Sequence, residues 1–230
     1  MTQRFAITPP PQPTLPVRGS DEVYPVHRVY CVGRNYAAHA IEMGHDPNRE
    51  PPFFFQKNPD NLVCGSGEFP YPSKSSDVHF EIELVVALAR GGANIPVETA
   101  LDHVFGYGVG LDMTRRDLQG QAKDMGRPWE IGKAFERSAP AGPIHPVAET
   151  GHLDRGRVEL KVNGELRQEG DLGQMIWKVP EMISHLSEYF DLAAGDVILS
   201  GTPSGVGPVV RGDVIEASIE GLGSITVKVV

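Results

Sequence analysis

The sequence predicts an α+β protein built mainly from antiparallel strands in mixed sheets, with a few short helices. The 230 residues include 26 glycines and 20 prolines, about one residue in five, against a usual share of roughly 12%. Hydrophobic residues make up 40% of the chain, which is enough for a packed core. The excess of glycine and proline therefore indicates turns between short strands, and hairpin connections favour antiparallel pairing.

The first strand and helix are predicted near the N-terminus. Residues 28–32 form a strand that runs into Gly33. Residues 35–43 form a helix, with Asn35 as its N-cap and Gly44 just past its end.

Two further strands and a short helix follow. Phe53, Phe54 and Phe55 begin a buried strand. Residues 79–89 alternate and then become continuously apolar, which is typical of a strand that enters the core. Pro96 favours a helix start, so a short helix is predicted over 96–102.

The middle of the chain contains an unusually glycine-rich strand over 105–113. Gly106, Gly108 and Gly110 share one face of it, which allows another segment to approach that face closely. A helix is predicted over 114–124, immediately after this strand.

The C-terminal part is predicted to be mostly strands. Residues 158–169 form a hairpin, with Asn163–Gly164 as a type I′ turn. A helix over 177–189 is interrupted near its start by Pro180. The remaining segments read as strands: 197–200, 213–219 and 224–230.

Composition and charge exclude several classes of function. The net charge of −9 argues against nucleic acid as a partner, because phosphate binding needs clustered lysine and arginine. The longest apolar run, Leu84 to Ala89, is far shorter than the roughly 20 residues that span a bilayer, and the N-terminus has no signal pattern. Cys31 and Cys64 form no C-x-x-C motif, so no disulfide framework or zinc site is expected. We therefore expect a cytoplasmic protein.

The prolines concentrate in residues 1–20, which favours an extended arm that packs on a partner subunit. Residues 21–230 have the length of a single domain.

Three acidic residues suggest a metal site. Glu81 and Glu83 lie at i and i+2 of a predicted strand, so their carboxylates share a face, about 7 Å apart along the chain. His79 lies on the same face and is a further candidate ligand. Asp112 ends the glycine-rich strand. Together Glu81, Glu83 and Asp112 offer one face of an octahedral site for Mg²⁺, or Mn²⁺ or Ca²⁺, with three positions left for substrate or water.

Simpler interpretations of these acids remain open. The two glutamates are also typical of the solvated face of an edge strand. An aspartate at a strand end before a helix is a common N-cap.

His39 and Glu42 are three residues apart on a predicted helix and share a face. A carboxylate beside an imidazole fixes its tautomer and raises its basicity, so this pair is a candidate base for deprotonating water. An ordinary exposed helix face is the simpler interpretation of this spacing. Gly33 and Gly44 on either side would let the helix move as a lid.

Basic and polar residues provide candidate substrate contacts. Lys133 stands in the apolar setting IGKAF, where an ammonium is either paired with a carboxylate or used as an electrostatic stabiliser. Arg116 and Gln119 share a helix face near the candidate metal site. The loop that contains Gly201 and Thr202 follows a strand, and its amides and hydroxyl suit a carboxylate. It lacks the G-K-[ST] ending of a P-loop, and no G-x-S-x-G motif is present.

Taken together, these segments resemble the fumarylacetoacetate hydrolase superfamily. Five motifs occur in the family's order over residues 28–230: Val32–Tyr36 with His39 and Glu42, Phe80–Leu84, Gly110–Thr114 with Arg116 and Gln119, Gly132–Phe135 with Pro140, Gly142 and Pro143, and Gly201–Val206. Within the superfamily, the proline-rich arm and residues 42–61 look most like the short bacterial branch of fumarylpyruvate hydrolases.

The resemblance implies a mixed β-roll-like fold, a homodimer and a divalent metal. The ligands it implies are Glu81, Glu83 and Asp112, with His39 and Glu42 activating water on a mobile lid. Substrate or transition-state contacts then come from Arg34, Asn35, Arg116, Gln119, Lys133, Gly201 and Thr202. His79 is not needed as a ligand in this picture and is placed outside the metal's direct ligands.

The reaction expected from these roles is Mg²⁺-dependent cleavage of a 2,4-dioxo acid between C3 and C4, with fumarylpyruvate giving fumarate and pyruvate. The substrate is a small dicarboxylate or 2-oxo acid. The same metal and enolate chemistry also serves oxaloacetate decarboxylation or isomerisation of a 2-hydroxydienoate, which need no attacking water. A non-catalytic metal-binding module is a third alternative.

Overall fold

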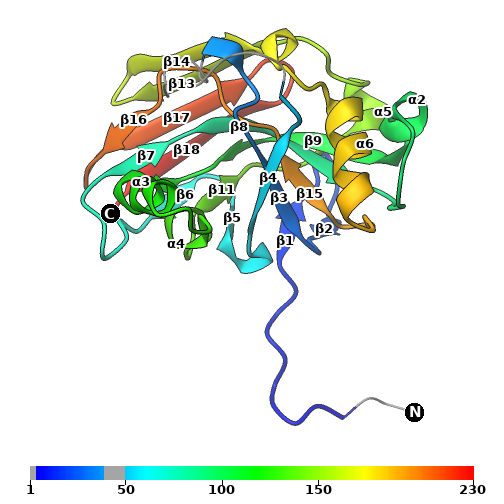
Figure 1. Cartoon of the computed structure of the whole chain (residues 1–230), viewed down its shortest axis with the longest axis horizontal. Helices are drawn as coiled ribbons and strands as arrows, with labels where there is room; N and C mark the ends of the chain where they lie inside the picture. Colours follow the sequence, from blue (N-terminus) through cyan, green and yellow to red (C-terminus); the bar gives the residue numbers. More distant parts are fainter. Residues whose placement is uncertain (1–3, 39–49) are drawn as a thin grey trace.

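The computed structural model describes residues 4–38 and 50–230, and within them the chain forms curled mixed sheets flanked by short helices (Figure 1). The largest sheet has eight strands. Seven of them follow the order β4-β3-β15-β8-β9-β11-β5, and β12 pairs with β9. Their bounds are β3 Val29–Gly33, β4 Phe53–Lys57, β5 Leu62–Cys64, β8 Ile82–Leu88, β9 Val104–Leu111, β11 Ala139–Ala141, β12 His145–Pro146 and β15 Val197–Leu199.

A five-stranded sheet with the order β14-β13-β17-β18-β6 packs against one face of the large sheet. Its strands are β6 Gly67–Phe69, β13 Arg157–Val162, β14 Glu165–Asp171, β17 Val214–Ile219 and β18 Gly223–Val229. Asn163 and Gly164 both have positive φ, 52° and 80°, between β13 and β14. The predicted type I′ turn is therefore confirmed.

Two small sheets complete the architecture. One has the order β10-β7-β16, from Thr114–Arg115, Val78–Phe80 and Gly207–Val209, and the other pairs β1 (Thr14–Pro16) with β2 (Val23–Pro25). Parallel pairs occur at β11–β5, β15–β3 and β18–β6, and the other named strand pairs are antiparallel. The predicted α+β class with mainly antiparallel pairing is confirmed.

The two faces of the large sheet bury separate apolar clusters. Along β8, Leu84 and Val86 point into the cluster shared with the five-stranded sheet, while Val85 and Ala87 point into a smaller cluster with β1 and β2. A strand that is buried on both faces has no polar alternation, which explains its continuous apolar run.

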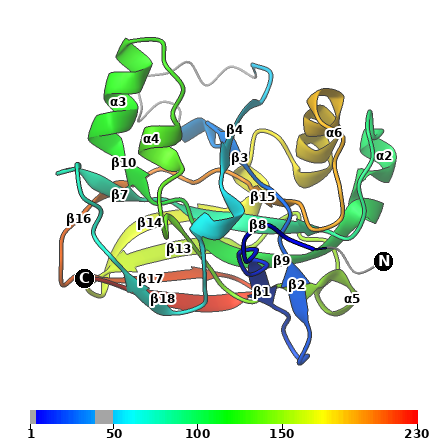
Figure 2. The ribbon, with the colours of Figure 1, turned by 90° about the horizontal axis from the view of Figure 1, so that it is seen from below.

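The helices lie at the edges of the sheets. The α-helices are α2 Val97–Ala100, α3 Arg116–Asp124, α4 Glu130–Lys133, α5 Val147–Thr150 and α6 Val179–Tyr189, and the 3₁₀ turns are Pro59–Asn61, Leu101–His103 and Leu172–Gln174. In Figures 1 and 2, α3 and α4 lie on one side of the ends of β3 and β4, and α2 and α6 lie on the other. None of the described helices is long and apolar enough to cross a membrane.

The glycine-rich strand β9 does admit a close neighbour. A Cβ on Gly106 would lie 2.3 Å from the carbonyl oxygen of His145, and one on Gly108 would lie 3.1 Å from that of Pro143. The segment that contains β12, which pairs with β9, therefore approaches Gly106 and Gly108 closely, and a side chain at Gly106 would collide with it.

Two predicted elements are divided differently in the structure. The strand expected over 79–89 is broken at Glu81, because β7 and β8 belong to different sheets. The helix expected from Thr114 begins at Arg116, because Thr114 and Arg115 pair with β7. Both corrections come from long-range strand pairing, which local propensity does not report.

Two predicted effects on helices are also corrected. Pro180 does not interrupt α6 but sits in its first turn, where the missing N–H has no partner to lose. Asn35 does not cap a helix: helical residues begin at Ala37, and the Asn35 side chain binds other segments.

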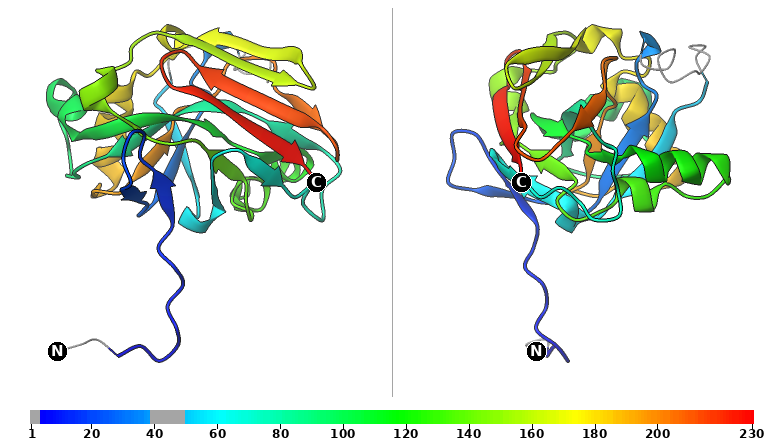
Figure 3. Two further views of the ribbon diagram at one scale, coloured as in Figure 1. Left: turned by 180° about the vertical axis from the view of Figure 1, so that it is seen from behind. Right: turned by 90° about the vertical axis from the view of Figure 1, so that its left-hand side faces the viewer.

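The N-terminal segment extends away from the body of the protein (Figures 1 and 3). Phe5 and Ile7 are 61% and 80% exposed. Leu15 in β1 is fully buried in the smaller apolar cluster, so the last part of residues 1–20 packs on the large sheet.

Candidate active site

Three carboxylates meet where β7 and β9 end and β8 begins. Glu81 stands between β7 and β8, Glu83 lies in β8, and Asp112 directly follows β9. The Asp112 amide donates to the Glu81 carbonyl at 2.9 Å, which joins the two chain segments. One oxygen from each carboxylate lies within 4.8 Å of the others, and the three residues are 0–4% exposed. A solvated edge strand and an N-cap, the simpler interpretations, do not describe this buried cluster.

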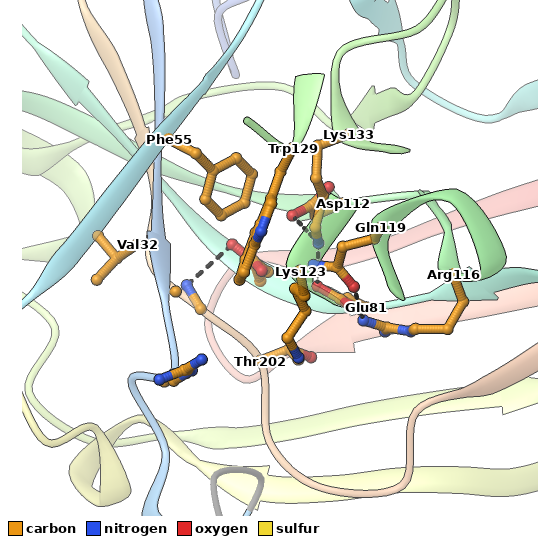
Figure 4. Close-up of a pocket in the computed structure, with 14 residues that line it drawn as sticks. Val32, Phe55, Glu81, Asp112, Arg116, Gln119, Lys123, Trp129, Lys133 and Thr202 are labelled. Carbon is orange, nitrogen blue, oxygen red and sulfur yellow. Dashed lines mark hydrogen bonds and ion pairs between the residues drawn. The ribbon is translucent and has the colours of Figure 1, made fainter. Parts of the chain in front are cut away.

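Lys133 neutralises part of this charge (Figure 4). Its Nζ lies 2.8 Å from Glu81 Oε2 and 2.7 Å from Asp112 Oδ2, and it donates to Thr114 Oγ1 at 2.7 Å. Burial alone would lower the pKa of Lys133, but the carboxylates of Asp112 and Glu81 outweigh it and the pKa is raised. The ammonium therefore stays charged beside the acids.

Arg116 and Gln119 lie together on the first turns of α3, as predicted. The Arg116 guanidinium forms an ion pair with Glu81 and donates to Gln119 Oε1 at 2.7 Å. Gln119 is thereby held beside the carboxylates with its amide group oriented.

Lys57, at the end of β4, is a second buried lysine of the cluster. Its Nζ lies 2.8 Å from Asp112 Oδ1, and both side chains are fully buried. The ammonium also donates to the carbonyls of Met113 and Lys133 and to Ser138 Oγ. These bonds use its three protons, so its contact with Oδ1 is electrostatic and Oδ1 accepts no hydrogen bond from a described residue.

Glu83 has less compensation than the other two acids. Its Oε2 accepts a hydrogen bond from the Gly201 amide at 2.9 Å. Burial, followed by the charges of Asp112 and Glu81, raises the pKa of Glu83 well above its ordinary value. A buried carboxylate in this state gains from a nearby cation.

The donor set fits a divalent metal ion. Three buried carboxylates converge, Asp112 Oδ1 lacks a hydrogen-bond donor among the described residues, and Glu83 is destabilised as an anion. Oxygen-only ligands of this kind suit hard divalent cations.

A pocket opens over the carboxylates. Besides these acids, its walls are formed by Val32, Gly33, Arg34, Phe55, Arg116, Gln119, Lys123, Trp129, Lys133, Gly201 and Thr202. Positive charge on the walls offsets the acidic floor, so the pocket suits an anionic ligand that also contacts a metal.

Two polar groups of the loop that was predicted to bind a carboxylate form hydrogen bonds within the protein. The Gly201 amide is used by Glu83 rather than pointing to open solvent. Thr202 Oγ1 accepts a hydrogen bond from Gln168 Nε2 at 2.8 Å, and Gln168 Oε1 in turn accepts from the Ile82 amide. Both Gly201 and Thr202 still line the pocket.

Asn35, predicted as a substrate contact, is fully buried and does not line the pocket. Its side chain donates to the carbonyls of Trp177 and Ser200 at 3.0 and 2.8 Å and accepts from the Trp177 amide at 2.7 Å. It therefore joins three segments. Arg34, the preceding residue, does line the pocket.

The predicted base pair, His39 and Glu42, lies outside the described residues. His79 does not line the pocket, and its Nε2 lies 2.9 Å from Asp77 Oδ1.

Sequence reasoning missed Lys57 and the wall residues Phe55, Lys123 and Trp129. Lys57 carries a detectable signal, because it lies two residues after Phe55 and so shares its face of the strand. Trp129 carries none, because it precedes a four-residue helix whose position depends on packing against α3.

Known proteins share this fold closely. A crystal structure of fumarylpyruvate hydrolase from Pseudomonas aeruginosa in complex with Mn²⁺ and pyruvate is 53% identical, with 99% of each chain covered and a TM-score of 0.97. A fumarylpyruvate hydrolase of Ralstonia is 41% identical over 80% of this chain and 95% of its own. An oxaloacetate tautomerase of Escherichia coli is 42% identical over 90% of this chain and 94% of its own.

Residues 28–230 match the family described as fumarylacetoacetate (FAA) hydrolase C-terminal. This range includes the buried carboxylates, the basic residues around them and both large sheets. The chain belongs to the fumarylacetoacetate hydrolase family of enzymes.

Proposed function

We propose that the protein is a metal-dependent hydrolase that cleaves fumarylpyruvate, a 2,4-dioxo acid, into fumarate and pyruvate. The observation that carries the proposal is the buried acidic triad under a pocket with basic walls. It is supported by 53% identity to a fumarylpyruvate hydrolase that was crystallised with Mn²⁺ and pyruvate. In this proposal the reaction is a step in the breakdown of aromatic compounds of the gentisate type.

Glu81, Glu83 and Asp112 would hold the metal ion, which we propose to be Mg²⁺, with Mn²⁺ or Ca²⁺ as alternatives. A divalent cation there supplies positive charge that polarises the 2-oxo group and stabilises the enolate that develops during cleavage.

The basic residues of the pocket bind and orient the substrate. Arg116 and Lys133 already contact Glu81, so they stand where a bound 2-oxo acid meets the carboxylates. Lys133 and Gln119, the latter held by Arg116, place the attacking water and the C4 carbonyl oxygen, and Thr202 is a further substrate contact. Because these groups are fixed before substrate arrives, they stabilise developing charge with little reorganisation.

The attacking water must be deprotonated by a base. We assign this role to His39, assisted by Glu42, because of their spacing in the sequence. His39 takes a proton from water, and the water oxygen bonds to C4 of the substrate. The C3–C4 bond then breaks, its electron pair passes to C3 as the pyruvate enolate, and protonation of C3 gives pyruvate. One water is consumed and fumarate is the other product.

Oxaloacetate chemistry is the second candidate function. The E. coli oxaloacetate tautomerase is as similar to this chain as the Ralstonia fumarylpyruvate hydrolase, at 42% and 41% identity. Tautomerisation and decarboxylation of oxaloacetate need the enolate but no attacking water. The His39–Glu42 pair therefore favours hydrolysis.

The test compares fumarylpyruvate, acetylpyruvate and oxaloacetate, with turnover followed by loss of the enol absorbance, with Mg²⁺ or Mn²⁺ and again with EDTA. Hydrolysis of the acylpyruvates that EDTA abolishes is expected. His39→Ala should lose hydrolysis while keeping any oxaloacetate activity. Turnover of oxaloacetate alone would establish the second candidate, and silence on all three would favour a binding module.

We further propose that the protein works in the cytoplasm as a homodimer in which the N-terminal arm contacts the second copy. The exposed Phe5 and Ile7 on an extended segment support this contact.

A further inference from the structure

One wall of the pocket is aromatic and has no part in the reaction steps above. The rings of Phe55 and Trp129 both line the pocket, with centroids 5.9 Å apart. Phe53 packs on Trp129 with centroids 4.8 Å apart and is 42% exposed, so it supports the wall near the surface. Figure 4 shows Phe55 and Trp129 facing the pocket on the same side as Lys133. Flat rings of this kind favour a flat, conjugated group lying against them.

Arg34 and Lys123 also line this pocket, in addition to Arg116 and Lys133, which form ion pairs with the triad. Lys123 Nζ lies 5.6 Å from the centroid of the Trp129 ring. Burial lowers the pKa of Lys123, and the charges of Arg34 and then Arg116 lower it further. Arg34 lines the same pocket as Lys123 and the two rings. No carboxylate of residues 4–38 or 50–230 forms an ion pair with Arg34. Two cationic side chains in the lining of one pocket suit the anionic group of a ligand.

The backbone of Arg34 is also unusual. Its φ is 60°, in the left-handed region that non-glycine residues seldom occupy. This conformation directly follows β3, whose last residues, Val32 and Gly33, line the pocket. Strained backbone of this kind is concentrated at binding sites, where it fixes the direction of a side chain.

We infer that Phe55, Trp129, Arg34 and Lys123 form an acyl subsite that selects a planar, unsaturated acyl group ending in a carboxylate. The inference rests on the proposed function and names the class of acyl group that this site accepts. The 2-oxo acid end of the substrate lies at the triad, the conjugated part lies against the two rings, and the distal carboxylate meets the two cations. An acetyl group carries neither feature.

Substrate preference tests the inference directly. Lys123→Gln should lower kcat/KM for fumarylpyruvate about 10- to 100-fold, the range expected for loss of a charge-assisted contact. The same variant should change kcat/KM for acetylpyruvate less than about threefold, and Lys123→Arg should retain most of the preference. Arg127→Gln is the matched control, because Arg127 is exposed on the same segment and does not line the pocket.

Equilibrium binding of product analogues gives a readout that does not depend on turnover. Calorimetry of the Mg²⁺-loaded protein would compare fumarate with crotonate, in which a methyl group replaces one carboxylate. Lys123→Gln should weaken fumarate about tenfold or more and leave crotonate unchanged. Trp129→Leu should weaken both ligands, because both present the planar double bond.

The outcomes separate the two proposals. Equal losses for fumarylpyruvate and acetylpyruvate in Lys123→Gln, or equal binding of fumarate by this variant and the wild type, would overturn the subsite. Wild-type protein that hydrolyses acetylpyruvate but not fumarylpyruvate would overturn the subsite and leave acylpyruvate hydrolysis in place. No turnover of any acylpyruvate, together with selective fumarate binding that needs Lys123, would overturn the reaction and support the subsite.

Discussion

Lys57 forms a buried ion pair with Asp112, one of the three acids of the triad, with 2.8 Å between Nζ and Oδ1 and no exposed side-chain surface on either residue. Asp112 is also paired with Lys133 through its other oxygen, at 2.7 Å. One carboxylate thus has a cation on each side. The two cations offset part of the free-energy cost of burying the carboxylates, and they fix the direction in which the Asp112 side chain points.

Loss of the Lys57 charge should therefore destabilise the protein strongly. We expect Lys57→Met to lower the free energy of unfolding by about 3–5 kcal/mol in EDTA, because it leaves a buried acid short of a partner. Urea unfolding followed by circular dichroism would measure this. Added Mg²⁺ or Mn²⁺ should restore part of the loss, since a cation at the triad replaces some of the missing charge.

The control for this experiment is Lys161→Met, at an exposed position of β13. It removes the same charge and is expected to change stability by no more than about 0.5 kcal/mol. Similar stabilities for the two variants would contradict the structural role of the Lys57–Asp112 pair.

Metal stabilisation should grow with pH. The pKa of Glu83 is raised in the folded protein, so without metal the folded state binds the proton more tightly than the unfolded chain. The stability that the protonated Glu83 contributes is therefore fully present below the ordinary pKa of glutamate. It is lost as the pH rises through the pKa of Glu83 in the folded protein. A metal ion competes with this proton and stabilises the deprotonated form.

We expect the rise in Tm caused by saturating Mn²⁺ to be larger at about pH 7.5 than at about pH 5. Differential scanning fluorimetry with and without EDTA would measure both shifts. Glu83→Gln should lose most of the metal response, whereas Glu216→Gln, an exposed acid on β17, should keep it. An equal response at the two pH values would show that Glu83 does not exchange its proton for the metal.

Gly201 should tolerate no side chain. Its φ is +90°, and a Cβ would lie 2.7 Å from Asn35 Cβ and 3.1 Å from the Val32 carbonyl oxygen. Gly201→Ala combines the cost of positive φ, about 1–2 kcal/mol, with overpacking of about 1–3 kcal/mol. It should also weaken metal binding, because the Gly201 amide orients Glu83.

Gly212→Ala separates these two costs. Gly212 has a similar φ of +99°, but nothing lies within 4 Å of its Cβ position. It should lose only the conformational part, about 1–2 kcal/mol, with unchanged metal affinity by calorimetry. If both variants lose the same stability and bind metal equally, the packing of Asn35 against Gly201 has no energetic role.

Removal of residues 1–11 should weaken the proposed homodimer. Burial of Phe5 and Ile7 at a partner is worth about 1.5–3 kcal/mol each, so the dimer dissociation constant should rise at least about tenfold. Light scattering over a dilution series would compare the shortened and full-length chains, with Phe5→Ser/Ile7→Ser as the second variant. Unchanged dissociation in both would place the dimer contact elsewhere.

The sequence alone singled out Glu81, Glu83 and Asp112 as a candidate group, together with most of the polar residues that line the pocket. Glu81, Glu83 and Asp112 are recognisable because their spacing and their places at strand ends restrict where the carboxylates point. Arg116 and Gln119 follow from helical spacing in the same way. These are local relationships, and local geometry is encoded by neighbouring residues.

The tertiary structure decided how these groups are held. At Glu81 the chain passes from the sheet of β7 to the sheet of β8. Two contacts of the site join segments that are far apart in the chain: the Lys57–Asp112 ion pair and the hydrogen bond from the Gly201 amide to Glu83. Asn35 likewise has a helix-cap pattern in the sequence but serves a buried junction. Strand pairing and burial of charge depend on which distant segments meet, and a single sequence does not specify that through local propensity.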